Sequence, residues 1–211
     1  MEDRLTPGLY LEMTDALPAA YAHERVPQVL TWPGVQRATW WENVVPGRAD
    51  LPRVLDEFSL LGIYEVDDTF TAPGNDGYHF RRYPRPGQGS LSGRPTIGLS
   101  LVLISPTHPE HAQALRDWAD FVHIRHIAAT GNPGYTMITP YENVTAGDPR
   151  FMHFYEMDTD DPEAAFQAMT PRVIERLGGG FGTPRFDAWA FHESLRIMYV
   201  NSFRRLGEQV A

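Results

Sequence analysis

Runs and alternations of apolar residues divide the chain into short strands separated by helical segments. Apolar runs that follow turn residues predict strands over residues 8–14, 35–44, 60–67, 98–104, 135–144 and 152–158. Helical spacing and end signals predict helices over 18–30, 107–130 and 161–177. A last strand is predicted within 186–200, with a break at 192–194, and a helix over 194–206 remains the alternative.

The two strands 35–44 and 135–144 show the same alternation. Because side chains alternate across a strand, the odd positions of each form one face. These faces consist of Val35, Arg37, Thr39 and Trp41 in one strand, and of Tyr135, Met137, Thr139 and Tyr141 in the other. Each strand is therefore expected to direct one mixed row of side chains toward a single side of its sheet.

One segment of the chain occurs twice. Residues 21–44 and 121–144 align without a gap at an offset of 100, with eight identities in 24 positions. The matches are His23 with His123, Arg25 with Arg125, Pro33 with Pro133, Gly34 with Gly134, Thr39 with Thr139, and 42–44 with 142–144. Matching at this level indicates an internal duplication, which decides the architecture.

The duplication extends beyond this segment. Tyr64-Glu65 matches Tyr155-Glu156 at an offset of 91, so the first half carries about nine additional residues within 45–58. The stretch 71–95 is rich in Pro and Gly and replaces the second helix with a loop. Each half then reads as strand, helix, strand, strand, helix or loop, and strand, which is the ferredoxin-like unit.

These patterns predict an α+β fold made of two ferredoxin-like repeats, over 1–95 and 96–211. Helices on one face of an antiparallel sheet leave the other face to be covered. The repeats are therefore expected to pack sheet to sheet as an α/β barrel within one chain, and this pseudo-dimeric chain could itself form a homodimer.

Composition narrows the classes of partner and site. The 211 residues carry a formal net charge of −9 and no cysteine, which argues against nucleic acid as a partner and excludes thiolate sites. The chain has no apolar run of membrane-spanning length, and its acidic start does not resemble a secretory signal. We therefore expect no membrane partner and a cytoplasmic location.

A family resemblance follows from the second copy of the repeat. The helix end from Trp118 to Ile124, the turn Pro133-Gly134 and the segment 154–169 resemble dimeric α/β-barrel proteins, with EthD-like proteins as the nearest subgroup. The superfamily includes muconolactone isomerase, cofactor-free quinone-forming monooxygenases, polyketide cyclases and haem enzymes. The resemblance implies a cavity beside the sheet that holds a small, often aromatic molecule.

Two groups of residues are candidates for catalysis. His123 matches the helix-end histidine that points toward the pocket in the resembled family, and His23 repeats it. The structural alternative for both is a bond to a backbone carbonyl at the helix end. His153 and Tyr155 lie two apart on one strand and share a face, as a base and a hydrogen-bond donor would need to. Gly62 stands in place of His153 in the first half, which favours one pocket over two.

Aromatic residues and further histidines are candidates for substrate contact, with a place in the core as the alternative. They are Tyr64, Trp40, Trp41, Tyr141, Trp118, His79 and His192. The sequence has no phosphate-binding loop, dinucleotide fingerprint or nucleophile elbow, and His123 with His126 alone is a weak metal motif. No metal and no cofactor are predicted.

The leading hypothesis is a cofactor-independent enzyme that acts on a small aromatic or polyketide-like molecule. Proton abstraction beside a carbonyl by His153 or His123, with Tyr155 stabilising the oxyanion, would serve a cyclase, isomerase, dehydratase or lyase. Three alternatives remain: a cofactor-free monooxygenase, a non-catalytic small-molecule binding protein, and a haem protein.

Overall fold

A single antiparallel sheet forms the centre of the molecule. The computed structural model describes residues 7–74 and 76–211. Within these ranges nine strands follow the order β4-β1-β3-β2-β9-β6-β8-β7-β5, and β4 also pairs with β7, which closes the sheet into a barrel. The strands are β1 (Gly8–Thr14), β2 (Val35–Asn43), β3 (Leu60–Val66), β4 (Tyr78–Arg82), β5 (Gln88–Gly89), β6 (Gly98–Pro106), β7 (Tyr135–Asn143), β8 (Phe151–Met157) and β9 (Leu195–Val210).

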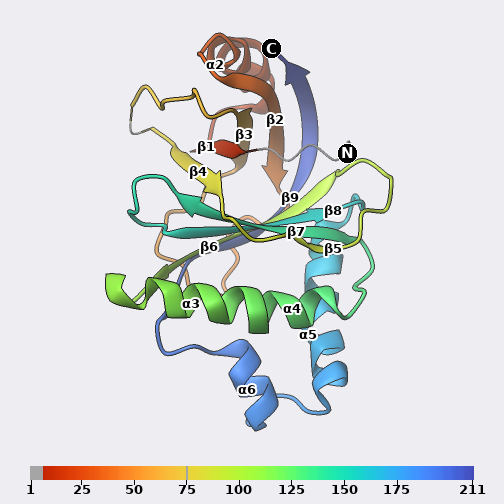
Figure 1. Ribbon diagram of the computed structural model, residues 1–211. Helices are drawn as coiled ribbons and strands as arrows, with labels where there is room; N and C mark the ends of the chain where they lie inside the picture. The colour runs from red at the N-terminus through yellow and green to blue at the C-terminus, as the bar shows by residue number, and fades with distance from the viewer. Residues whose placement is uncertain (1–6, 75) are drawn as a thin grey trace.

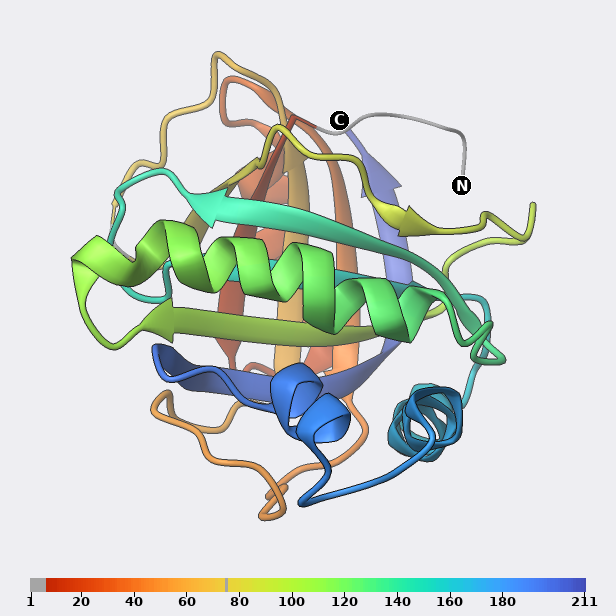
Figure 2. The ribbon, with the colours of Figure 1, turned by 60° about the horizontal axis from the view of Figure 1, so that its bottom comes forward.

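The two halves of the chain contribute strands in the same order. The first half supplies β4-β1-β3-β2 and the second supplies β9-β6-β8-β7, and the pairs β2–β9 and β4–β7 join them. Seen from below, the strands of the second half cross in front of those of the first (Figure 2). The predicted α+β class and barrel are confirmed.

Helices cover the outer faces of both halves, so the molecule is layered as helix, sheet, sheet and helix (Figure 1). The first half has one helical stretch made of α1 (Pro18–Ala20), the π-helical turn η1 (Tyr21–Arg25) and α2 (Val26–Leu30). The second half has the 3₁₀ turn η2 (Pro109–His111), α3 (Ala112–Trp118), the π-helical turn η3 (Ala119–His123), α4 (Ile124–Ala128), α5 (Pro162–Leu177) and α6 (Pro184–Ala190). Asp161 caps α5 by accepting from the Ala164 backbone N–H at 3.0 Å, and Gly178 ends it at a φ of 76°, as predicted.

The prediction for the end of the chain was wrong. The helix α6 occupies residues 186–190 of the predicted strand 186–200. The last strand, β9, runs from Leu195 to Val210, so the alternative of a helix over 194–206 is wrong as well. Pro184 begins α6, where its missing N–H is tolerated, and Phe186 and Trp189 are buried three residues apart on one helix face. β9 is long because it pairs with both β6 and β2.

The predicted alternation of side chains holds in β2 from Arg37 onward and in β7 from Met137 onward. Arg37, Thr39 and Trp41 line the barrel interior, as do the corresponding residues of β7. Val35 and Tyr135 instead pack on the helix side, because a β-bulge follows each of them. The two halves share even this irregularity.

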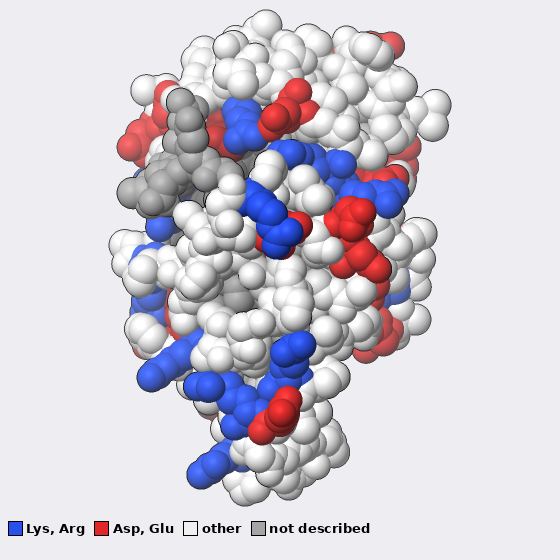
Figure 3. All heavy atoms as spheres, turned by 90° about the vertical axis from the view of Figure 1, so that its right-hand side faces the viewer, with Lys and Arg blue, Asp and Glu red and all other residues white. Residues whose placement is uncertain are grey.

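The stretch 71–95 contains the fourth strand of the first half. β4 lies within it, pairs with β1 and β7, and so completes the barrel, while no helix occurs among its described residues. Across residues 7–74 and 76–211, no helix is long and apolar enough to cross a membrane. On the face shown in Figure 3, uncharged residues cover much of the surface, acidic and basic side chains are interspersed in a band across its upper-middle part, and a smaller, mainly basic group lies near the bottom.

Candidate functional site

A largely apolar cavity of about 600 Å³ lies between the second-half sheet and its helices. We call it the helix-side cavity. Its size falls in the range of small-molecule sites, roughly 300–1,000 Å³. The sheet contributes side chains from β6, β8 and β9 to one wall, and η3, α5 and α6 form the opposite wall. The lining includes Ser100, Val102, Trp118, His123, His153, Tyr155, Phe166, Met169, Phe186, Trp189 and Ile197.

His153 and Tyr155 project from β8 into this cavity, on the shared face that their spacing predicted. The His153 side chain is 2% exposed, and its Nε2 atom is buried without a hydrogen-bond partner among the described residues. The nearest acidic atom is Oδ1 of Asp120, 3.8 Å away, which is close for a charge interaction but too long for a hydrogen bond.

Asp120 is held in place by two arginines. Its Oδ2 atom lies 3.1 Å from Nε of Arg116, one helical turn earlier, and 2.8 Å from Nη1 of Arg85. Arg116 is fully buried, and burial lowers the pKa of its guanidinium to about 10. Burial raises the pKa of Asp120, and the two arginines act in the opposite direction. The second oxygen of Asp120 therefore remains directed at His153 from a fixed carboxyl group.

Burial also sets the protonation of the two candidates on β8. It lowers the pKa of His153 well below the ordinary value, and the positive charge of Arg116 adds to this effect. His153 is consequently a neutral imidazole at pH 7. Burial raises the pKa of Tyr155, so its phenol stays protonated and can donate a hydrogen bond.

His123 lines the same cavity but is already engaged with α6. Its Nδ1 atom lies 3.0 Å from the backbone oxygen of Trp189, and the Trp189 indole donates to the backbone oxygen of His123 at 3.1 Å. The two rings stack with centroids 5.0 Å apart and planes 7° from parallel. His123 thus makes the backbone contact that the structural alternative described, and it fixes one wall of the cavity.

The other predicted residues are placed in three regions. Trp118 lines the helix-side cavity, and His192 packs on it with ring centroids 5.4 Å apart. Trp41 and Tyr141 line a different cavity inside the barrel. The remaining four residues lie on first-half elements and line neither cavity. His23 is exposed, and Tyr64 is buried under the helical stretch 18–30. Trp40 packs against Gly207, and His79 packs against Phe70.

Sequence reasoning missed Asp120, Arg116 and Arg85. The i, i+4 spacing of Arg116 and Asp120 was a visible signal for an ion pair on one helix face, but its burial was not. It also missed that the additional residues of the first half reach this site. Asp50 and Leu51, from the loop between β2 and β3, line the helix-side cavity.

Comparisons with known proteins identify the fold. No protein-family description matches the chain, and no curated protein matches it in sequence. A solved structure described as an anthrone oxidase-like protein is similar over 96% of this chain and 92% of its own, with a TM-score of 0.53 and 12% identity. A putative monooxygenase from Fusobacterium nucleatum aligns with a TM-score of 0.47 and 8% identity, over 93% of this chain and 94% of its own. A putative monooxygenase from Lactobacillus acidophilus aligns with a TM-score of 0.47 and 9% identity, over 98% of this chain and 99% of its own. The first of these likenesses shows a shared barrel fold.

Proposed function

We propose that the protein is a cofactor-independent enzyme that removes a proton beside a carbonyl group of a small aromatic or polyketide-like molecule. The observation that carries this proposal is the neutral His153 in the wall of an apolar cavity, with the Asp120 carboxyl 3.8 Å behind it. A neutral imidazole supplies the lone pair that a general base needs, and a nearby carboxylate would stabilise the imidazolium that forms.

The proposed proton transfer follows from the positions of these groups. With Asp120 on the Nε2 side, a ring proton on Nε2 points toward the carboxyl group and leaves the Nδ1 lone pair as the acceptor. When His153 takes the substrate proton, the Asp120 charge stabilises the imidazolium that forms. Tyr155, protonated and on the same strand face, would donate to the enolate oxygen.

The rest of the lining favours an aromatic substrate. Phe166, Phe186, Trp118 and Trp189 bring four aromatic rings to the helix-side cavity. Flat apolar walls bury the faces of an aromatic molecule and exclude water, which strengthens the electrostatic effect of the few polar groups. Cyclisation, isomerisation, dehydration and C–C cleavage can each begin from the resulting enolate.

A cofactor-free monooxygenase is the second candidate, and the whole-chain likeness to a protein described as anthrone oxidase-like favours it. The same first step serves this reaction, because the enolate of an electron-rich ring can pass electrons to O₂. The overall change would convert a ring CH₂ group into a carbonyl, with one oxygen atom of O₂ entering the product and the other leaving as water.

Anthrone is a suitable probe, because its methylene group lies across the ring from its carbonyl and is conjugated with it, so loss of a methylene proton gives the same kind of enolate as loss of a proton beside a carbonyl. The protein, dialysed against a chelator, is expected to accelerate deuterium exchange at that methylene in D₂O without air. Oxygen uptake in air, with formation of the quinone, would then select the monooxygenase. Tight binding of anthrone without exchange or oxidation would instead identify a binding protein, and a Soret band in the purified protein would identify a haem protein.

The origin of the site is part of the same proposal. We infer that the barrel is a tandem pair of EthD-like, ferredoxin-like repeats, 1–95 and 96–211, and that the catalytic cavity belongs to the second. The identical strand order of the two halves and the matching bulges in β2 and β7 support the duplication.

A further inference from the structure

A buried serine lies on the sheet wall of the helix-side cavity. Ser100 is the third residue of β6, where alternation directs it with Val102 toward the helices, while Leu99 and Leu101 pack in the barrel core. The residue is fully buried, and its hydroxyl oxygen has no hydrogen-bond partner among the residues that the structure describes. A buried hydroxyl without a partner is costly, so a ligand that accepts a hydrogen bond from it would be favoured.

The neighbouring hydroxyl groups leave the Ser100 proton without an acceptor. Ser202, its register partner on β9, donates to Oε2 of Glu163 at 2.8 Å and is therefore engaged with α5. Burial raises the pKa of Tyr135, and the nearby Ser100 hydroxyl acts in the opposite direction. Like Ser100, the Tyr135 hydroxyl has no partner of hydrogen-bond geometry within 7–74 and 76–211. Two hydroxyls that bond each other use one of their two protons, and only Ser100 of these two lines the cavity.

Tyr155 is the cross-strand neighbour of Ser100. The register of β6 and β8 places the two residues directly opposite each other, and both line the helix-side cavity. Residues in this relation have Cβ atoms roughly 4.5–5.5 Å apart, so two hydroxyl groups from neighbouring strands can approach one ligand oxygen. A carbonyl oxygen has two lone pairs and can accept both hydrogen bonds.

The first half of the chain fills the corresponding position with an aromatic ring. Both β1 and β6 begin with Gly-Leu, and the third residue of β1 is Tyr10. Tyr10 lies opposite Tyr64 in register, as Ser100 lies opposite Tyr155. The buried Tyr10 ring packs on Tyr64 and Phe70, with centroids 6.1 and 5.4 Å away. In the second half the small serine stands in the wall of an open cavity instead.

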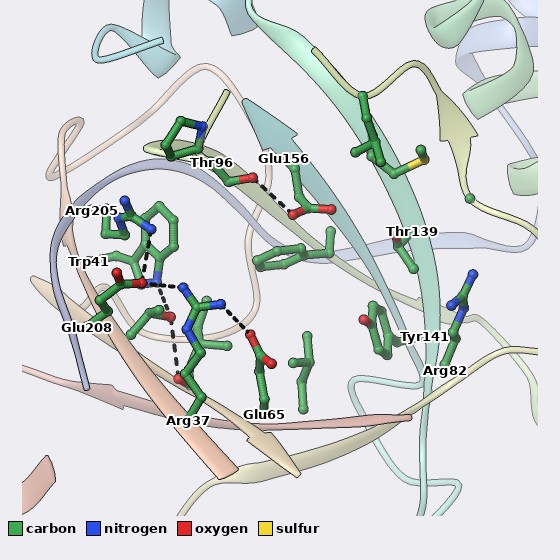
Figure 4. A pocket seen from close by; sticks show the side chains of 18 of the residues that line it. Arg37, Trp41, Glu65, Arg82, Thr96, Thr139, Tyr141, Glu156, Arg205 and Glu208 are labelled. Atoms are coloured by element: carbon green, nitrogen blue, oxygen red, sulfur yellow. Dashed lines mark hydrogen bonds and ion pairs between the residues drawn. The ribbon is translucent and has the colours of Figure 1, made fainter. Parts of the chain in front are cut away.

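The opposite face of the sheet gives a contrast, because polar side chains there have partners. Glu156, the residue after Tyr155, lines a separate cavity of about 450 Å³ inside the barrel (Figure 4). Its Oε1 atom accepts from the Thr96 hydroxyl at 3.1 Å, and the Trp41 indole donates to the Thr39 hydroxyl at 2.9 Å. Burial raises the pKa of Glu156 to about 7.

We propose that Ser100 and Tyr155 form a two-donor site for the carbonyl oxygen of an aromatic ketone, with Tyr135 donating to Ser100 from behind. In the proposed reaction, on which this assignment rests, that oxygen becomes the enolate oxygen, and two donors stabilise its charge better than Tyr155 alone. Ser100 is then a catalytic residue, and Tyr135 is a positioning residue that acts through it. The site favours ketones over hydrocarbons of the same shape.

A matched pair of probes tests the binding part of the proposal. 9-Fluorenone and fluorene share one ring skeleton, and only fluorenone has a carbonyl oxygen. Fluorenone has no proton beside its carbonyl, so its binding does not depend on the proposed proton transfer. We expect it to bind about fivefold tighter than fluorene or better, as hydrogen bonds of ordinary strength allow. Tryptophan fluorescence follows the titrations, because Trp118 and Trp189 line the cavity. Equal affinities, or no binding of either probe, would overturn the proposal.

Three variants assign the donors. Ser100→Ala removes only the hydroxyl oxygen and is expected to lower fluorenone affinity about fivefold while fluorene affinity stays unchanged. Tyr135→Phe should have a smaller effect of the same kind. Thr170→Val is the control, because Thr170 is a hydroxyl residue of α5 in the opposite wall. A loss of ketone preference in Thr170→Val, with none in Ser100→Ala, would overturn the role of Ser100.

The carbonyl stretching band of bound fluorenone reports the hydrogen bonds themselves. We expect it at lower wavenumber than in an apolar solvent, and Ser100→Ala should return it part of the way. An unchanged band in Ser100→Ala would contradict the proposal, even if affinity falls. Thermal unfolding should show that Ser100→Ala is at least as stable as the natural protein, because the substitution removes a buried hydroxyl without a partner.

Deuterium exchange of anthrone tests the catalytic part. Ser100→Ala is expected to slow it by about tenfold or more, because a donor to the developing charge is lost. An exchange rate equal to that of the natural protein would overturn the catalytic role of Ser100. If the natural protein does not exchange anthrone at all, the proposed function fails, and the fluorenone measurements still decide whether the two-donor site exists.

Discussion

The hydroxyl oxygen of Tyr21 lies 1.8 Å from the position that a Cβ atom on Gly62 would occupy. Gly62 is the counterpart of His153, and Tyr21 is the counterpart of Phe121, which is 57% exposed. In the first half, the tyrosine fills the space above the strand and bonds Tyr64 at 2.7 Å. In the second half the equivalent ring turns outward, and a histidine stands on the strand beside an open cavity.

Gly62→Ala is expected to destabilise the protein by about 1–3 kcal/mol, because the added methyl group forces the Tyr21 ring from a packed position. In a Tyr21→Ala background most of this cost should disappear, since the space is then free. Chemical denaturation of the two single variants and the double variant measures the coupling. Gly180→Ala is the control, because its nearest neighbour would lie 3.6 Å away. Additive costs at positions 21 and 62 would contradict this account of the closed first half.

Arg48 connects the additional loop of the first half to the second half. Its side chain is 2% exposed, pairs with Glu163 of α5, and donates to Oδ1 of Asn201 at 3.3 Å. Arg48→Ala removes a buried guanidinium and its charged contact with the half-buried Glu163, which keeps hydrogen bonds from Ser202 and Gln167, and is expected to cost about 1–3 kcal/mol of stability.

The same substitution should raise KM more than it lowers kcat, because Asp50 and Leu51 beside Arg48 line the helix-side cavity. Thermal unfolding and steady-state kinetics measure the two effects. Arg204→Ala removes a surface pair with Glu42 and should change stability by less than about 0.5 kcal/mol. Similar small losses at positions 48 and 204 would show that the loop is not anchored in this way.

Glu156 makes stability depend on pH in a defined window. Its pKa is raised from 4.5 to about 7, so the folded protein holds a proton that the unfolded chain has released. Stability from this group is therefore fully present below pH 4.5 and is lost as the pH rises to about 7.

Glu156→Gln is expected to be more stable than the natural protein at pH 8, by on the order of 3 kcal/mol, because each pKa unit corresponds to about 1.4 kcal/mol. The difference should disappear below pH 4.5. Denaturation curves at several pH values check this. A Glu156→Gln variant that is less stable than the natural protein at pH 8 would contradict the raised pKa of the buried Glu156 carboxyl group.

The aligned segments 21–44 and 121–144 provide a matched pair in His123 and His23. His123→Ala removes the bond to the Trp189 backbone and the ring stack, so we expect a loss of about 1–3 kcal/mol and a higher KM. His23→Ala should change neither, because His23 is exposed. His123→Asn, whose amide can reproduce the Nδ1 contact, should restore part of the stability. If His123→Ala is as stable as the natural protein, the His123 contacts with Trp189 do not stabilise the wall of the cavity.

Much of the fold was predictable because matching segments and alternation can be read directly from the sequence. The shared residues around Pro33-Gly34 and Pro133-Gly134 located the helix-to-strand unit of each half, and strand spacing placed His153 with Tyr155. The end of the chain was not predictable in the same way. FDAWAFHESL contains both strand and helix spacings, and the pairing of β9 with two partners, which is a long-range effect, decides between them.

The site shows the same division between local and long-range signals. Strand spacing could bring His153 and Tyr155 together, but the buried charges behind them come from a helix and a distant loop. Arg85 lies in the Pro-rich stretch that the sequence indicated only as a loop, and it reaches Asp120 across the fold. The filling of the first-half space by Tyr21 was likewise visible only as the exchange of Gly62 for His153.

The central claim is that His153 removes a proton from a substrate in the helix-side cavity. Deuterium exchange at the anthrone methylene, followed by NMR without oxygen in His153→Gln and His23→Gln proteins of normal stability, tests it most directly. We predict that His153→Gln slows exchange by about 100-fold or more, the usual contribution of a general base, while His23→Gln exchanges at the natural rate. An exchange rate in His153→Gln within about twofold of the natural protein would contradict the claim.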